Sequence, residues 1–489
     1  MPYLAKYLQK TKEIDRNHAV IAYLAILDHL QKIDKNIADS IVQELKDQRS
    51  NLKLIASENY SSLAVQLAMG NLLTDKYSEG YPGHRFYSGC DNVDTIELEA
   101  IELAKKIFGA DHAYVQPHSG ADANMIAFWA ILVKRIQNKE IEALGKKSVD
   151  ELSRKEYEKI RKLLLNQKMM GMALTSGGHL THGYLHNVSS KMMRAVNYEV
   201  DSKTHLIDYS KLAKQVKKEK PLILVAGYSA YAGLIDFAKM REIADSVQAV
   251  LLVDMAHFAG LVAGGVYKGI YNPVPFADIL TSTTHKTLRG PRGGIILCKD
   301  EYREIIDRGC PLVEGGPLPH VMAAKAIAFK EASTLEFCNY ARQVVNNAKA
   351  LAEKLKELGC TLITNGTENH LVLIDVAKSF SLTGRQAENG LRQARITVNR
   401  NTIPLDQNGP WYTSGIRIGT PAVTTLGMKE EQMQVLAELI VDILKNSSTP
   451  SQESSKAKVM VKEEILQGSK DRVGHMLNNF PLYPEIEID

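Results

Sequence analysis

Apolar positions follow two different patterns along the chain. Up to about residue 74 they recur every three or four residues, as at Leu24, Leu27 and Leu30, which predicts helices. Further on, short continuous apolar runs alternate with helical stretches, a pattern typical of strands that are buried on both faces. The predicted strands are residues 113–115, 222–225, 250–253, 279–281 and 294–297. This alternation predicts an α/β fold with a large, mostly parallel sheet.

The same patterns divide the chain into four predicted regions. A strand at 370–375 and a closing helix near 430–444 indicate a second, smaller α/β domain after the large one. The last region begins with a serine-rich stretch and has no assigned role. The predicted regions are a helical arm (1–74), a large domain with a charged insertion at about 134–170 (75–312), a smaller C-terminal domain (313–446) and a polar C-terminal tail (447–489).

Composition and charge argue against a nucleic-acid-binding, membrane-spanning or disulfide-rich protein. The 489 residues include 60 basic and 56 acidic side chains, and the resulting net charge of +4 is too small to favour nucleic acid or an anionic membrane as a partner. The five cysteines are odd in number and lack metal-ligand spacing, so reduced thiols in a cytoplasmic protein without a metal site are expected. The most apolar stretch, 249–266, is interrupted by Asp254 and His257, so a membrane span is not expected.

The strongest chemical signal is the run Ser282–Gly294, which contains Lys286. This lysine follows an apolar strand and stands among small hydroxyl residues, a histidine and a glycine turn. A desolvated amine in such a place can have a lowered pKa and can form a Schiff base with a carbonyl cofactor. Thr283 and His285 are candidate catalytic residues beside it. The alternative is a solvated surface lysine.

An acidic residue ends another predicted strand upstream of this run. Asp254 follows the apolar residues 249–253, and ligands of open α/β sheets bind at the carboxyl ends of strands. A carboxylate there can hold a pyridinium nitrogen protonated, the arrangement that makes pyridoxal phosphate an electron sink. The alternative is a helix N-cap.

With Lys286 and Asp254 placed, the chain resembles serine hydroxymethyltransferase (glycine hydroxymethyltransferase), a fold-type-I family that is aspartate-aminotransferase-like and uses pyridoxal phosphate. The resemblance implies reversible conversion of L-serine and tetrahydrofolate to glycine and 5,10-methylenetetrahydrofolate, through an aldimine and a glycine quinonoid. Such an enzyme supplies glycine and one-carbon units. The motifs that carry the resemblance are Leu54–Tyr60, Lys76–Gly83, Gly177–Gly183, Val253–His257 and Thr413–Ala422.

The resemblance also implies a set of residues that bind the cofactor. Lys286 would hold it covalently, and the phosphate would lie at the start of a predicted helix that runs toward Ile136. Some contacts would come from a neighbouring subunit, so the resemblance implies an obligate homodimer with shared active sites, or a tetramer. The remaining residues are Ser119 and Gly120 at the phosphate, His179 on the ring face, Ser229 and His257 near the phenolic oxygen, Asp254 at the ring nitrogen, and Tyr77, Gly315 and Gly316 from the neighbouring subunit.

Substrate contacts follow from the same resemblance. Arg417 would bind the substrate carboxylate with help from Ser57, since a planar guanidinium suits that bidentate task. Glu79 of the neighbouring subunit would act as the acid–base carboxyl, and Tyr87 would contact substrate. Each of these cofactor and substrate contacts has a purely structural alternative. Ser119 and Gly120 could form an ordinary turn, the histidines could be core residues, and Arg417 and Glu79 could be surface charges. The implied tetrahydrofolate contacts are Leu174, Gly178, Leu180 and Asn401.

The chain departs from the family pattern at the phosphate. Ala121-Asp122 replaces the usual Ser-Gln, Glu314 lies in a loop that is usually glycine-rich, and Phe86 replaces a tyrosine. Like charges a few ångströms apart repel by about 1–4 kcal/mol, so two acids near a phosphate predict weaker cofactor retention than is usual for the family.

Residues 134–170 are longer than in the usual bacterial family member and carry eleven basic and six acidic side chains. One interpretation is a solvated helical hairpin. The other is electrostatic guidance of polyglutamylated folate toward residues 174–182.

Three other functions stay open from the residues alone. One is a pyridoxal phosphate aldolase that acts on threonine without folate, and another is an amino-acid racemase side activity. The third is a non-catalytic scaffold, which would be expected to have lost some of the predicted residues; Lys286, Asp254, His179, Arg417 and Glu79 are all present.

Overall fold

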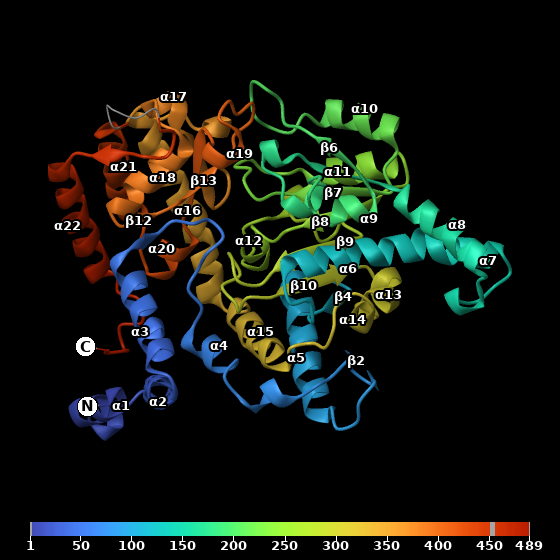
Figure 1. Ribbon diagram of the computed structural model, residues 1–489, viewed down its shortest axis with the longest axis horizontal. Helices are drawn as coiled ribbons and strands as arrows, with labels where there is room; N and C mark the ends of the chain where they lie inside the picture. Colours follow the sequence, from blue (N-terminus) through green and yellow to red (C-terminus); the bar gives the residue numbers. More distant parts are fainter. Residues whose placement is uncertain (1, 450–454, 489) are drawn as a thin grey trace.

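A seven-stranded sheet forms the centre of the computed structural model, which describes residues 2–449 and 455–488 (Figure 1). Within this sheet β10 alone runs antiparallel to its two neighbours, β4 and β9. The predicted mostly parallel sheet is therefore confirmed. In sheet order the strands are β4 (His112–Tyr114), β10 (Gly294–Cys298), β9 (Ile279–Thr283), β8 (Val250–Asp254), β7 (Ile223–Gly227), β5 (Lys168–Met172) and β6 (Arg194–Tyr198).

The central strands are buried along their whole length, because helices cover both faces of the sheet. Successive side chains of a strand point to opposite faces, so Leu224 and Leu251 belong to one core whereas Val225 and Leu252 belong to the other. The second core is covered mainly by α6 (Gly120–Leu132). The first core is covered by α5 (Asp91–Phe108), α10 (Tyr209–Glu219), α11 (Phe237–Asp245), α12 (Ala259–Ala263), α15 (Pro319–Ala332) and α16 (Leu335–Glu357).

A smaller antiparallel sheet lies beside the large one. Its strands are in the order β11, β14 and β13, and helices cover it to form a separate core. The long helix α16 contributes Phe337 to the first core and Leu355 to this one, so a single rigid element links the two sheets. The elements of the smaller sheet and its cover are β11 (Leu371–Asp375), β13 (Asn399–Asn401), β14 (Gly415–Gly419), α18 (Gly384–Gln393), α20 (Pro421–Thr425) and α21 (Glu430–Lys445).

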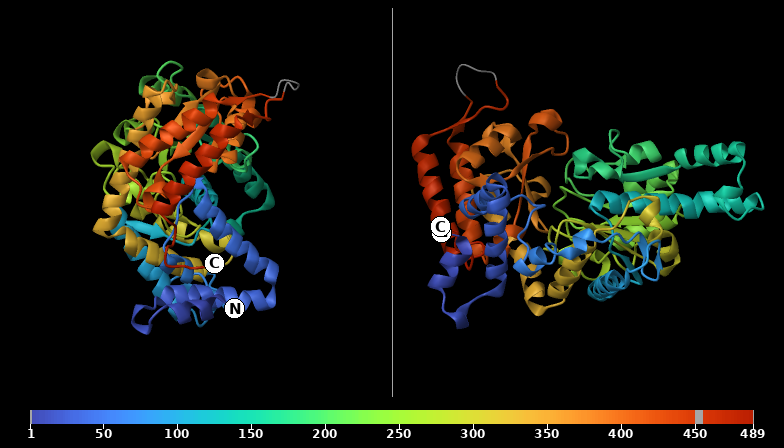
Figure 2. Two further views of the ribbon diagram at one scale, coloured as in Figure 1. Left: turned by 90° about the vertical axis from the view of Figure 1, so that its left-hand side faces the viewer. Right: turned by 60° about the horizontal axis from the view of Figure 1, so that its bottom comes forward.

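The N-terminal arm packs against the C-terminal end of the chain. Leu24 and Leu27 of α2 share a core with Leu482 and Ile486, and Arg49 donates to the carbonyl oxygens of Leu482 and Ile486 at 2.9 and 2.8 Å. Figure 2 shows the chain end beside this arm and the last helix against α21. The elements involved are α1 (Tyr3–Lys10), α2 (His18–Ile33), α3 (Lys35–Ser50), α4 (Leu63–Leu67) and α22 (Glu463–Asn479).

The predicted polar tail therefore contributes apolar residues to two cores. Leu466 and Val473 of α22 pack with the smaller sheet, while Leu482 and Ile486 pack with the arm. The polar run that begins this tail is described only to Thr449, and residues 450–454 lie outside the described part. A two-residue parallel ladder between β1 (Leu52–Lys53) and β12 (Ile396–Thr397) also joins the arm to the smaller sheet.

The charged insertion forms a helical hairpin that projects from the body of the molecule (Figure 1). It comprises α7 (Asn138–Ala143) and α8 (Arg154–Leu165), and it joins the end of α6 that is remote from Ser119. At 1.5 Å per residue, its tip is roughly 35 Å from the start of α6. Its charge is largely screened over that distance, since the Debye length is about 8 Å. The geometry therefore favours the solvated hairpin over guidance of folate into the pocket of the same chain.

Short elements complete the described part. They are β2 (Gly80–Tyr81), β3 (His84–Arg85), α9 (Ser189–Met192), α13 (Arg303–Asp307), α14 (Gly309–Leu312), α17 (Val376–Phe380), α19 (Gly409–Tyr412), β15 (Ser447–Ser448) and β16 (Met460–Val461). All five cysteines are free, in agreement with the predicted thiols. Among the described helices, none combines the length and apolar character that crossing a membrane requires.

Candidate active site

A pocket of about 490 Å³ lies at the carboxyl ends of β7, β8 and β9 and is also lined by β14 of the smaller sheet. This is the edge at which ligands of open α/β sheets bind. The pocket brings together predicted residues from across the sequence: Ser57, Ser119, Gly120, His179, Ser229, Asp254, His257, Thr283, His285, Lys286 and Arg417.

Lys286 lies in the turn that follows β9. Its side chain is buried, and its carbonyl oxygen accepts a hydrogen bond from Asn59 Nδ2 at 2.9 Å. Burial lowers the pKa of the Lys286 amine to about 8; the charge of Asp254 opposes this change, and the charges of Arg417 and Arg292 add to it. The amine is therefore far easier to deprotonate than that of a surface lysine, whose pKa is about 10.4.

Asp254 ends β8, lines the pocket and is only 5% exposed. Its Oδ2 accepts hydrogen bonds from His182 Nε2 and Asn124 Nδ2, both at 2.9 Å, and its Oδ1 accepts one from the amide of Ala256 at 3.1 Å. Burial is the largest single influence and raises the pKa of Asp254. The hydrogen bonds from His182 and Asn124 and the electrostatic influence of the His182 and His179 imidazoles outweigh it, so the pKa of Asp254 lies well below its usual range. The carboxylate is therefore negative at neutral pH.

The histidines of the pocket are neutral. Burial lowers the pKa of His179 to about 4, and burial also lowers the pKa of His285 and of His370 to about 3 each. His257 Nδ1 lies 3.2 Å from His370 Nε2, and their rings stack with centroids 5.4 Å apart. Two neutral imidazoles in this contact share one proton, so the tautomers of His257 and His370 depend on each other.

Arg417 of β14 is positioned by two hydrogen bonds. Its Nε donates to Asn399 Oδ1 at 3.1 Å, and its Nη1 donates to the carbonyl oxygen of Ser229 at 2.6 Å. Neither bond uses Nη2, so donors remain for a planar anion such as a carboxylate. Burial lowers the pKa of Arg417 to about 10, which still leaves the side chain charged at neutral pH.

The N-terminus of α6 forms one end of the pocket. Ser119 caps this helix by accepting a hydrogen bond from the amide of Asp122 at 3.2 Å. A Cβ atom at Gly120 would lie 2.7 Å from Thr283 Cγ2, so glycine is needed for α6 to approach β9 this closely. The amide groups and the dipole of a helix N-terminus bind phosphate well. A low-pKa amine, a buried carboxylate and this helix start together fit the aldehyde, ring nitrogen and phosphate of pyridoxal phosphate.

The two unusual acids have partners within the chain. Ser119 Oγ donates to Asp122 Oδ2 at 2.8 Å, so the hydroxyl predicted to bind phosphate is engaged by a carboxylate. Glu314 accepts from Tyr114 Oη at 3.2 Å and from the amide of His118 at 3.4 Å, and burial raises the pKa of its carboxyl.

A second group of predicted residues does not line this pocket. Tyr77 and Tyr87 contact each other edge to face, with ring centroids 5.4 Å apart, and both are exposed. Contact with Glu79 raises the pKa of Tyr87. Gly316 is close to the Tyr77 ring, since a Cβ atom there would lie 3.1 Å from Cζ. The residues outside the lining of the pocket are Tyr77, Glu79, Tyr87, Leu174, Gly178, Leu180, Gly315, Gly316 and Asn401.

Sequence reasoning gave no role to Asn124 and His182, the two side chains that bind Asp254. A signal for His182 was present, because it stands three residues after His179 in the motif Gly177–Gly183. Asn124 lies inside the phosphate segment, but its contact with Asp254 spans 130 residues of sequence. Such a contact leaves no local pattern.

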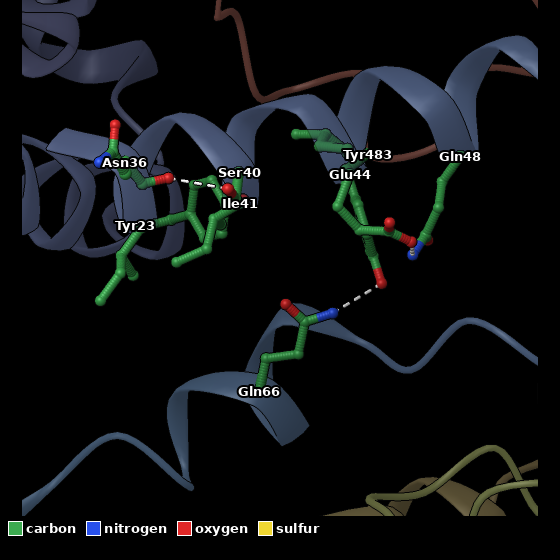
Figure 3. A pocket seen from close by; sticks show the side chains of 10 residues that line it. Tyr23, Asn36, Ser40, Ile41, Glu44, Gln48, Gln66 and Tyr483 are labelled. Carbon is green, nitrogen blue, oxygen red and sulfur yellow. Dashed lines mark hydrogen bonds between the residues drawn. The ribbon is translucent and has the colours of Figure 1, made fainter.

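A hollow of about 530 Å³ lies far from these residues, between the N-terminal arm and the chain end. Figure 3 shows Gln66 donating to Tyr483 Oη across it, at 2.7 Å, with Tyr23 and Ile41 nearby. Its lining contains neither lysine nor histidine, and Glu44 is the only acidic residue among the described residues that line it. It therefore lacks the groups that acid–base or amine chemistry needs.

Comparisons with known proteins agree with this geometry. A family model described as "Serine hydroxymethyltransferase" matches residues 30–144 and 157–440. A serine hydroxymethyltransferase of Chlamydia trachomatis serovar D is 53% identical over 491 aligned residues, which cover 99% of both chains. One of Treponema pallidum is 55% identical over 99% of this chain and 85% of its own, and one of Chlamydia caviae is 54% identical over 96% and 95%.

Proposed function

Because the chain belongs to the serine hydroxymethyltransferase family, we propose that the pocket at the ends of β7, β8 and β9 is where it interconverts serine and glycine. The family is one of transferases in one-carbon metabolism, and it implies the use of pyridoxal phosphate and tetrahydrofolate. The observation that carries the proposal is a buried amine of lowered pKa, Lys286, in one pocket with the buried carboxylate of Asp254.

Several residues of the pocket would act directly on the cofactor. Lys286 would hold the cofactor covalently through its side-chain amine, whose lowered pKa favours the neutral, nucleophilic form. Asp254 would keep a proton on the ring nitrogen, His179 would lie against the ring, and Ser229 and His257 would contact the phenolic oxygen. When bound, pyridoxal phosphate supplies a ring that accepts the electron pair released as the bond between the α and β carbons of serine breaks.

The substrate is oriented by charge. Arg417 binds the serine carboxylate in a bidentate fashion with Ser57 beside it, since its Nη2 is left free by its bonds to Asn399 and Ser229. We propose Leu174, Gly178, Leu180 and Asn401 as contacts of tetrahydrofolate. Thr283 and His285 complete the wall next to Lys286.

The residues outside the pocket support a homodimer. Tyr77, Tyr87 and Gly315 are exposed in the single chain, although the family pattern assigns them to an active site. A second copy of the chain would use these residues and Glu79, whose carboxyl would exchange a proton with the serine hydroxyl. A dimer, or a tetramer of two such dimers, and a cytoplasmic location are parts of this proposal.

The function is tested by glycine formation from serine with and without tetrahydrofolate. We expect turnover to depend on folate, because the one-carbon unit needs an acceptor. Threonine cleavage that is faster than serine cleavage and independent of folate would instead favour the aldolase. The absorbance of the holoenzyme with glycine, before and after tetrahydrofolate is added, reports whether both ligands occupy one site.

The lowered pKa of Lys286 predicts the pH dependence of cofactor capture. The neutral amine is the nucleophile, so the rate at which apoprotein takes up pyridoxal phosphate should rise with pH and level off above about 8. Stopped-flow absorbance over a pH series measures this rate. A rate that keeps rising toward about pH 10.4 would mean that an ordinary, exposed lysine reacts.

Asp122→Gln should tighten cofactor binding. The substitution removes a negative charge at the start of α6 and replaces the charged acceptor of the Ser119 hydroxyl by a weaker, neutral one, so we expect affinity for pyridoxal phosphate to rise by about three- to tenfold. Equilibrium titration of apoprotein measures it, and pyridoxal without its phosphate is the control ligand, whose affinity should not change. Glu314→Gln should have a smaller effect, because Glu314 does not line the pocket and its carboxyl accepts hydrogen bonds from Tyr114 and from the amide of His118. No tightening in either variant would contradict the predicted cost of the two acids.

A further inference from the structure

A lysine that has no part in the proposed chemistry is buried behind the start of α6. Lys325 of α15 is only 1% exposed. Its Nζ donates to the carbonyl oxygens of Val115, Pro117 and Gly294 at 2.6, 2.9 and 2.8 Å. An ammonium group has three donors and no acceptor, so these three bonds satisfy it completely.

The three carbonyl groups belong to the backbone that leads to the phosphate end of the pocket. Val115 and Pro117 lie in the turn between β4 and α6, and Gly294 begins β10. Because these carbonyl oxygens are turned toward α15, the turn has a fixed orientation as it enters Ser119. The amide of Gly294 also donates to the Pro117 carbonyl at 2.8 Å, which ties β10 to the same turn.

Lys325 and Ser119 are both packed closely against the backbone of Gly293 and Gly294. A Cβ atom at Gly293 would lie 2.6 Å from Lys325 Cε, and one at Gly294 would lie 2.2 Å from the carbonyl oxygen of Ser119. A shift of the ammonium group therefore displaces the backbone that carries Ser119, because interiors packed at this density transmit small movements.

Packing alone does not explain why a charged side chain is buried at this position. Burying an ammonium group is costly even when it is fully hydrogen-bonded, and an apolar side chain of similar volume is often equally stable or more so. Burial lowers the pKa of Lys325, while the nearby Glu314 carboxylate opposes that change, so the charge is partly balanced. Three carbonyl oxygens facing one nitrogen require the protonated amine.

We propose that Lys325 is a positioning residue for the cofactor phosphate: its ammonium group holds the turn before α6 so that Ser119 and the first amides of the helix face the phosphate. The inference rests on the proposed function. It concerns only the phosphate, so it predicts no effect on a ligand that lacks one.

The test compares two ligands and two variants. Lys325→Met removes the charge and the three donors but keeps a similar volume, and Lys330→Met makes the same change at an exposed position of the same helix. Affinity of each apoprotein for pyridoxal phosphate and for pyridoxal is measured by equilibrium absorbance titration. Lys325→Met should bind pyridoxal phosphate at least about tenfold more weakly and pyridoxal within about twofold of the unmodified chain. Lys330→Met should bind both as the unmodified chain does.

The outcomes separate this inference from the proposed function. Equal losses for both ligands, or no loss, in Lys325→Met would overturn the role of Lys325. An unmodified chain that binds pyridoxal as tightly as pyridoxal phosphate would instead remove the phosphate site at α6. If Lys325→Met does not fold, Gly293→Ala gives the second test, since it keeps the charge but displaces Cε. A selective loss of pyridoxal phosphate supports the inference, and unchanged selectivity overturns it.

Discussion

Lys286→Ala should lose the covalent link to pyridoxal phosphate and nearly all serine turnover. The buried amine is the only lysine among the residues that line the pocket, so no neighbour can replace it there. We expect folate-dependent glycine formation to fall by at least about a thousandfold, which corresponds to roughly 4 kcal/mol of transition-state stabilisation. Cofactor absorbance after dialysis and turnover at saturating serine measure the two losses.

Two controls distinguish the loss of the Lys286 amine from a general loss of folded protein. Lys330→Ala, an exposed lysine on α15, should keep both the cofactor and the activity. The thermal midpoint of Lys286→Ala apoprotein should be close to or above that of the unmodified apoprotein, because an amine whose pKa falls on folding destabilises the folded state at neutral pH. Retention of the covalent link in Lys286→Ala would show that another lysine holds the cofactor.

Asp254→Asn should keep the cofactor bound to Lys286 but lose most of the turnover. The negative carboxylate is stabilised by His182, Asn124 and the amide of Ala256, and an amide cannot hold a proton on the ring nitrogen. Without that proton the ring accepts electrons poorly. We expect turnover to fall by about a hundred- to a thousandfold, or roughly 3–4 kcal/mol in the barrier.

The low pKa of Asp254 also gives an expectation for the pH dependence of turnover. Its pKa lies well below the usual range, so its ionisation contributes no change in rate at neutral or weakly acidic pH. The matched control is Asp471→Asn on the exposed face of α22, which should change neither turnover nor cofactor content. Full activity in Asp254→Asn would remove the ring-nitrogen role and leave Asp254 as a turn-forming residue bound to Ala256.

Local patterns in the sequence predicted the central strands but not all of the sheet. Strands β7 and β8 are mostly apolar runs and β9 begins with Ile279 and Leu280, and burial on both faces explains that composition. Strand β5 is rich in methionine and contains glycine, and β6 is at the edge of the sheet and partly exposed, so neither has a clear period. The packing of α22 depends on partners far away in sequence, which a local pattern does not contain.

The candidate site could likewise be predicted only in part from the sequence. Lys286 and Asp254 could be placed because each directly follows a strand, and the carboxyl ends of adjacent parallel strands meet. The side chains that hold the surrounding groups in place could not be predicted from the sequence. His182 reaches Asp254 across 72 residues, and Lys325 reaches Val115 across 210. Their roles arise from tertiary contacts, where burial and hydrogen bonding decide charge and orientation.

The contact between the two ends of the chain also constrains biosynthesis. The apolar faces of α2 and α3 are covered by Leu482 and Ile486, and Leu482 follows Arg49 of α3 by 433 residues. At about 5–20 residues per second, translation of the intervening chain takes roughly 20–90 s. Throughout that interval the nascent arm is without its cover, so its final docking waits until Leu482 and Ile486 have left the ribosome.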